Sequence, residues 1–335
     1  MTGARGPATD RPGRGRPSGA DMHRQLIIAM AGGLASAALS LGVLTGSGAA
    51  ILFAYFSPLP LLLVGLSLGL TSVSVGIALA AILVAWVAGA TQAAIYGISL
   101  ALPVWLITRY AIGTRKLAGG SAASYSAGDI LARMAVLGGL LLIFTALMTA
   151  SNEGGFAGAV RSFVDTILGA RLAASGAIDR EMLVDRLVPL FPAATALSWL
   201  VMFVINATLA QSFIRKAGKN LRSQTGYAQI TVPEWFYWIF VAVAAIALVA
   251  SGPVEYLARN LVVVLSAPFL FAGLGVIHIL VQRVALPGMA LTAFYIFIIL
   301  FSWAGFVVAW LGFLEPWVRL RERYRQPPGT DTEDE

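Results

Sequence analysis

Cysteine is absent from the 335-residue sequence, and histidine occurs only twice, as His23 and His278. The lack of cysteine excludes disulfide bonds, thiolate nucleophiles and Cys-ligated metal sites. His23 lies in a basic N-terminal stretch and His278 in an apolar one, so the two do not suggest a shared metal site. We therefore expect no metal and no cofactor.

Charged residues are also scarce. They make up 12% of the chain, whereas 58% is hydrophobic and the mean hydropathy is +0.82. A soluble domain carries about 25% charged residues, so this chain lacks the polar surface that water requires. The composition predicts a polytopic membrane protein in contact with the lipid bilayer.

The formal net charge of +7 does not indicate a nucleic-acid partner, because the Lys and Arg residues flank apolar segments. That distribution is explained by orientation in the membrane, where basic residues stay on the cytoplasmic side. We expect no binding to nucleic acid.

Motifs for catalysis and for energy coupling are missing. The sequence has no G-x-x-x-x-G-K-[ST], H-E-x-x-H or G-x-S-x-G. No Asp or Glu lies near the middle of a predicted span, which argues against a proton pump with a carboxylate relay. No nucleophile–base pair can be assembled, so we expect that the protein is not an enzyme.

The apolar stretch from Ile51 to Gly69 contains Pro58 and Pro60 near its middle. Proline removes a backbone donor and clashes with the preceding turn, and it disfavours helical geometry in the residue before it. A break in the helix is therefore predicted here. It is either a tight turn between two helices at the membrane surface or a discontinuity inside the bundle, where transporters often place binding sites.

The chain divides into three parts. Residues 1–24 are predicted to be a disordered basic tail, residues 25–320 a single transmembrane domain, and residues 321–335 a charged cytoplasmic tail. The N-terminus is expected in the cytoplasm. The first six predicted spans are 26–44, 51–69, 73–89, 91–112, 130–150 and 192–214.

Small residues recur along the first span in two adjacent stripes. Such stripes allow close approach of helix backbones. They are consistent either with packing inside the chain or with docking on another subunit. The residues are Ala29, Gly32, Gly33, Ser36, Ala37 and Ser40.

Residues 150–190 form a predicted extracytoplasmic insertion with charges of both signs. Phe156, Val160, Phe163, Ile167 and Leu168 lie near one helical face, which predicts a surface amphipathic helix within 155–188.

The last third contains three further apolar segments, 235–251, 260–282 and 288–314. Three crossings would place the basic C-terminal residues outside, against the positive-inside rule. Because Pro268, Gly273 and Gly275 interrupt the middle segment, we favour eight spans with 260–282 re-entrant or irregular. Nine spans are the alternative.

Neutral polar and aromatic residues are scattered through the spans, among them Asn206, Gln211 and His278. Interhelical contact is the simplest role for each one. Taken together, a set on the outward side is our candidate for a ligand pocket: Tyr55, Ser57, Gln92, Tyr96, Asn152 and Glu153, with Pro58 and Pro60 shaping the break.

Three stretches, FAYFSPLPLLLVGLSLG, RNLVVVLSAPFLFAGLGVIHIL and LGFLEPWVRLRER, resemble the YybS-like family of bacterial membrane proteins. That family is similar to the S components of energy-coupling-factor transporters. The resemblance implies a bacterial inner-membrane protein that binds a small molecule and works with a coupling subunit and separate ATPases. S components have about six spans, fewer than are predicted here.

Three functions follow as hypotheses. The chain is a small-molecule-binding transport subunit without its own ATPase, or a non-transporting scaffold or envelope-process protein that acts through helix–helix contacts. An intramembrane enzyme is the third and weakest hypothesis.

Overall fold

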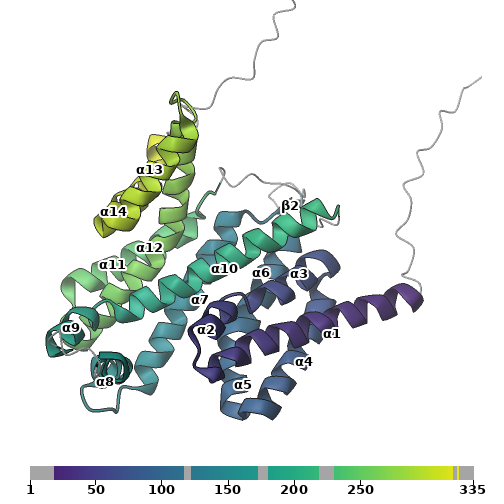
Figure 1. The fold of residues 1–335 in the computed structure, drawn as a ribbon. Helices are drawn as coiled ribbons and strands as arrows, with labels where there is room; N and C mark the ends of the chain where they lie inside the picture. Colours follow the sequence, from purple (N-terminus) through teal and green to yellow (C-terminus); the bar gives the residue numbers. More distant parts are fainter. Residues whose placement is uncertain (1–18, 117–121, 173–179, 219–229, 320–322, 324–335) are drawn as a thin grey trace, which may run out of the picture.

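The structure, a computed structural model, describes residues 19–116, 122–172, 180–218, 230–319 and 323 and is mainly helical (Figure 1). Within these residues, seven helices are long and apolar enough to cross a membrane, and one bent pair of helices would make an eighth. The predicted all-α polytopic bundle of about eight spans is confirmed.

The first six spans occur where the sequence predicts them. They are formed by α1 (Gly19–Leu41) with a 3-10 turn (Gly42–Thr45), α2 (Gly48–Ala54) with α3 (Pro58–Leu68), α4 (Leu70–Ala88), α5 (Ala90–Tyr96) with a π-helical segment (Gly97–Ala101) and α6 (Leu102–Ile112), α7 (Ala127–Met148), and α10 (Phe191–Lys216).

The predicted disordered tail of residues 1–24 is too long. Helix α1 begins at Gly19, with Asp21 in its first turn, where a carboxylate interacts favourably with the helix dipole. Residues 1–18 and, apart from Arg323, the predicted tail at 321–335 lie outside the described residues.

The predicted break at the two prolines is present, with a turn at Tyr55–Ser57 between α2 and α3. Pro58 starts α3, a position where the missing N–H has no helical partner to lose. The alternative of a surface turn between two spans is wrong, because residues 48–68 form one span of 21 residues. Ser57 also keeps helical dihedral angles (φ −58°, ψ −28°) instead of the expected extended ones.

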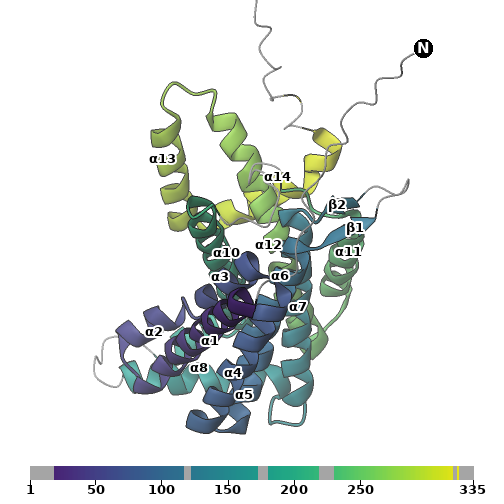
Figure 2. The same ribbon diagram turned by 90° about the vertical axis from the view of Figure 1, so that its right-hand side faces the viewer.

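Two elements close the ends of the bundle. A short antiparallel hairpin, β1 (Thr114–Lys116) with β2 (Ala122–Ser124), follows α6. Two surface helices, α8 (Gly155–Leu172) and α9 (Arg180–Leu187), follow α7. Figure 2 shows the hairpin at one end and α5 and α8 at the other; we call these the hairpin end and the α8 end.

Helix α8 is the amphipathic helix expected within 155–188, and α9 follows it as a second, shorter helix. Their buried residues are Phe156, Val160, Val164 and Val184. Phe156 and Val160 of the predicted apolar face are therefore buried, whereas Phe163 and Ile167 are exposed and Val164 is buried in their place. Ion pairs join the two helices: Arg180 contacts Asp165 at 2.6 Å, and Arg161 contacts Asp185. The hydrogen bond and the attraction from Asp185 raise the pKa of Arg161.

The last third differs most from expectation. Segment 260–282 is not re-entrant; it belongs to α12 (Gly252–Val281), an uninterrupted 30-residue helix that contains Pro268. Helix α11 (Glu234–Val249) has 16 residues, which at 1.5 Å per residue is short for about 30 Å of hydrocarbon. The predicted span 288–314 consists of α13 (Pro287–Leu300) and α14 (Ser302–Val318), bent by 117°.

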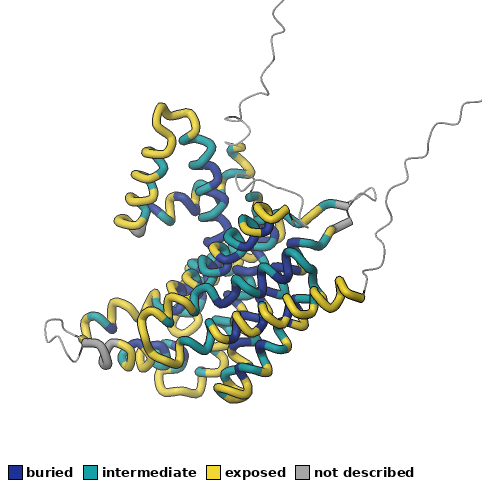
Figure 3. The backbone as a smooth tube through the Cα atoms, turned by 45° about the vertical axis from the view of Figure 1, so that its right-hand side comes forward, coloured by how far each residue is buried: buried dark blue, intermediate teal, exposed yellow. Residues whose placement is uncertain are grey.

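Two glycines bring α12 and α14 into close contact. A Cβ added at Gly273 would collide with the carbonyl oxygen of Val308, and one added at Gly312 with that of Phe269. The two glycines therefore allow the backbones of α12 and α14 to touch. Buried residues concentrate in the middle of the bundle, whereas no buried residue is found among the described residues of α13 (Figure 3).

Candidate functional site

A polar network surrounds the break between α2 and α3. The Ser36 hydroxyl of α1 donates to the carbonyl oxygen of Ser57 (2.7 Å) and lies 2.8 Å from the Tyr96 hydroxyl. All three residues are buried. A neighbouring helix thus donates a hydrogen bond to a backbone carbonyl of the broken turn, which helps to satisfy irregular backbone at membrane depth.

Helix α10 holds the same break from the other side. The Asn206 amide nitrogen donates to the backbone carbonyl oxygen of Tyr55 (2.9 Å). The Tyr55 hydroxyl in turn donates to the backbone carbonyl oxygen of Ser198 (2.8 Å). The Asn206 side-chain oxygen is buried without a hydrogen-bond partner. The network joins α1, α3, α5 and α10, so its evident role is to hold the break in place.

Among the described residues, the remaining predicted ligand residues take no part in the hydrogen bonds of this network, although Pro58 and Pro60 directly follow the broken turn. Pro58 is buried, and Pro60 and Gln92 are half-buried. Asn152 and Glu153 lie in the exposed turn between α7 and α8. No hydrogen bond in the described part of the chain joins their side chains to Tyr55 or Tyr96. A ligand-binding role for the set stays a prediction.

The small-residue stripe of α1 is covered by the chain itself. Ala29, Gly33, Ser36 and Ala37 are buried, and Gly32 and Ser40 are half-buried. A Cβ added at Gly33 would collide with the carbonyl oxygen of Gly76 in α4, and one added at Gly32 would lie 2.6 Å from Val64 Cγ2 in α3. The stripe is an internal packing face and is not left open for another subunit.

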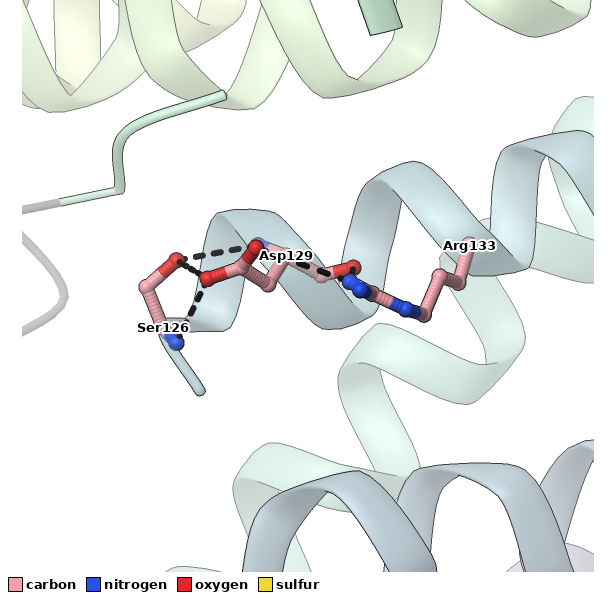
Figure 4. Close-up of polar contacts among 3 residues, drawn as sticks. All are labelled: Ser126, Asp129 and Arg133. Carbon is pink, nitrogen blue, oxygen red and sulfur yellow. Dashed lines mark hydrogen bonds and ion pairs between the residues drawn. The ribbon is translucent and has the colours of Figure 1, made fainter. Parts of the chain in front are cut away.

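An aromatic cluster encloses Arg133 at the hairpin end. Ser126 and Asp129 cap α7 by bonding to each other's backbone N–H, and Arg133 donates to the Asp129 carbonyl oxygen (2.8 Å) (Figure 4). The guanidinium lies 4.5 Å from the ring centre of Tyr110, 5.1 Å from that of Tyr125 and 5.5 Å from that of Trp235. This cation–π cluster ties α6, the residue that follows β2 and α11 to α7.

A cavity of about 380 Å³ lies between α6, α7, α10, α12 and α13. Its volume is within the range of about 300–1,000 Å³ that is usual for small-molecule sites. Most of the lining is apolar. The polar lining residues are Thr208, Gln211, His278, Gln282 and Tyr295.

The chemistry of the cavity centres on His278. Its Nδ1 lies 2.8 Å from the Leu274 carbonyl oxygen. Because a carbonyl can only accept, Nδ1 carries the proton and Nε2 of the neutral ring is an acceptor. Nε2 lies 3.5 Å from the Tyr295 hydroxyl, at the outer limit of a hydrogen bond. Both groups can therefore turn to a third polar atom.

Sequence reasoning missed this site, although it singled out Gln211 and His278 as polar residues within spans. None of the eight predicted ligand residues lines the cavity. A signal of the site was present in the sequence, because Gln211 and His278 both lie near the C-terminal ends of their helices. These two ends lie on the same side of the bundle, at the hairpin end. In the described residues, no group of three His, Cys, Asp or Glu side chains could hold a metal ion.

Comparison with known proteins identifies a family without a described activity. No curated protein and no solved structure matches the chain. The model of one family matches residues 34–315, which cover most of the chain and all of the cavity lining. The chain therefore belongs to the family described as predicted membrane protein DUF2232.

Proposed function

We propose that this chain is a small-molecule-binding membrane protein whose site is the cavity between α6, α7, α10, α12 and α13. The observation that carries the proposal is the combination of a 380 Å³ space, a mainly apolar lining and a few polar groups in one region. That combination is typical of ligand sites. The role proposed is binding without catalysis.

The proposed orientation places the hairpin end in the cytoplasm of a bacterial cell and the protein in its inner membrane. Arg24, Arg109, Arg215 and Lys216 lie at the ends of spans that reach the hairpin end. The α8 end instead carries paired charges, such as Arg180 with Asp165. An excess of basic residues favours the cytoplasmic side.

A transport role follows from the resemblance to S components and is part of the proposal. In that role the bound molecule is handed on with the help of a coupling subunit and separate ATPases. The chain's own α3 and α4 cover the stripe of α1, so such a subunit would contact the exposed face of α1, which includes Ile27 and Leu34.

The test compares three forms of the full chain purified from native membranes: wild type, Ala207→Phe and Ile205→Phe. Ala207 lines the cavity, whereas Ile205, on the same helix, is 40% exposed. Bound small molecules and proteins are identified by mass spectrometry, and each form is first checked for a monodisperse elution profile.

A small molecule that is present in wild type and Ile205→Phe but depleted in Ala207→Phe supports binding in the cavity. Copurification of an ATPase adds support for the transport role. Equal small-molecule content in all three forms overturns the proposal. Protein partners without any cavity-dependent small molecule favour the scaffold alternative instead.

A further inference from the structure

Polarity changes along the length of the cavity. On α10, Leu200 and Phe203 line the part nearer the membrane centre, and Thr208 and Gln211 the part nearer the hairpin end. Leu200 and Gln211 are eleven positions apart, which corresponds to about 16 Å along the helix. The cavity therefore combines a long apolar section with one polar end.

Helix α12 repeats this gradient, because the polar His278 and Gln282 come after the apolar Phe271, whereas the lining residues of α7 are apolar throughout. Both α10 and α12 run toward the hairpin end, so their polar residues meet at the same level. This is the order of polarity that a lipid leaflet has from its centre to its surface.

No charged side chain is part of the cavity lining in the described residues. Burial of an unpaired charge in an apolar site is costly, so the part of a ligand inside the cavity is uncharged. The polar end offers an acceptor at His278 Nε2 and a donor at the Tyr295 hydroxyl, separated by 3.5 Å. A hydroxyl or carbonyl oxygen that lies beside this pair can bond to at least one of the two groups, since a hydroxyl donates to Nε2 and a carbonyl accepts from the Tyr295 hydroxyl.

We propose that the cavity binds a neutral single-chain amphiphile, with a hydroxyl or carbonyl head group at His278 and Tyr295 and an apolar chain along Phe203 and Leu200. The ligand comes from the leaflet at the hairpin end. This inference rests on the proposed function, since it names the ligand class of the same cavity.

The experiment uses the full chain in lipid nanodiscs and two photoreactive forms of 1-hexadecanol. One carries a diazirine near the end of the chain and the other carries it next to the hydroxyl. After illumination, labelled peptides are mapped by mass spectrometry. We expect the first probe to label around Met134 and Leu200, and the second around His278 and Tyr295.

Competition defines the ligand class. Unlabelled 1-hexadecanol should reduce the labelling of these peptides, and hexadecanoic acid at pH 8 should require at least a tenfold higher concentration. His278→Leu should reduce head-group labelling several-fold, whereas Leu140→Ala, on the exposed face of α7, should not change it. Thermal unfolding of both variants is measured first, and His278→Gln, which keeps a polar group, serves if His278→Leu is unstable.

The outcomes separate this inference from the proposed function. If the acid competes as well as the alcohol, or if both probes label the same depth, the neutral-amphiphile assignment is overturned although the cavity still binds a small molecule. If neither probe labels the lining and the purified wild type carries no cavity-dependent molecule, the proposed function fails as well.

Discussion

Replacement of Gly312 by alanine tests whether α14 is held by direct backbone contact with α12. A Cβ at this position would collide with the carbonyl oxygen of Phe269 and lie 2.6 Å from the backbone nitrogen of Gly273. Neither atom can rotate away as a side chain can, so the two helices must separate. Gly305, on the same helix, has no atom within 4 Å of an added Cβ, and Gly305→Ala is the matched control.

The expected magnitude follows from the two positions. Alanine stabilises a helix relative to glycine by about 0.5–1 kcal/mol, and both variants share this gain. Overpacking of a close contact costs about 1–3 kcal/mol, and only Gly312→Ala incurs that cost. Gly312→Ala should therefore be less stable than Gly305→Ala by about 1–3 kcal/mol, the overpacking term alone.

The free energy of unfolding is measured by titration of sodium dodecyl sulfate into micelles of a mild detergent. Tryptophan fluorescence reports the transition, because the Trp310 ring stacks on Phe313 at 5.2 Å beside the substituted position. If Gly312→Ala and Gly305→Ala unfold at the same detergent fraction, the close α12–α14 contact is not present, and the reasoning fails.

Three further predictions address other contacts. Gly33→Ala should lower the free energy of unfolding by about 1–3 kcal/mol through overpacking against Gly76, and unchanged stability in the same titration would contradict internal packing of the stripe. Asn206→Leu should cost about 1 kcal/mol and speed amide hydrogen exchange around residues 55–57, because Tyr55 loses a bond to its carbonyl oxygen; unchanged exchange there would exclude a role in holding the break. Arg133→Met should cost about 1–2 kcal/mol through lost cation–π contacts and speed exchange in β2 more than in α4, and a uniform effect would contradict a local clamp.

The first six spans were predictable because length and apolarity alone define them. The helix break at the prolines was also predictable, but its depth was not. Whether a turn lies at the surface or inside a span depends on partners distant in sequence, here Ser36 and Asn206, which bond to the carbonyls of the broken turn. The sequence around the two prolines contains no pattern that identifies these partners.

The prediction for the last third was wrong because proline and glycine can either interrupt a membrane helix or lie within a continuous one. Pro268 was taken as a break, yet α12 continues through it with the Ser266 hydroxyl bonded to the Val263 carbonyl (2.7 Å) in the preceding turn. The sharp bend occurs instead at Phe301, between two apolar helices where no proline or glycine is adjacent. The sequence pattern therefore favoured a break in the wrong segment.

Gly273 and Gly275 show why the cavity could not be found from residue types. They are two positions apart, about 200° around a helix with 3.6 residues per turn, so they face nearly opposite directions. Gly273 admits α14 against one face of α12, whereas Gly275 lines the cavity on the other. The same residue type thus removes space on one side of the helix and leaves it on the other.

Polar residues of similar type also have different roles on one helix. Asn206 bonds to the broken turn, whereas Gln211, little more than one turn further along α10, lines the cavity. Since neighbouring helices decide between these roles, the site becomes visible only once α10, α12 and α13 are placed together.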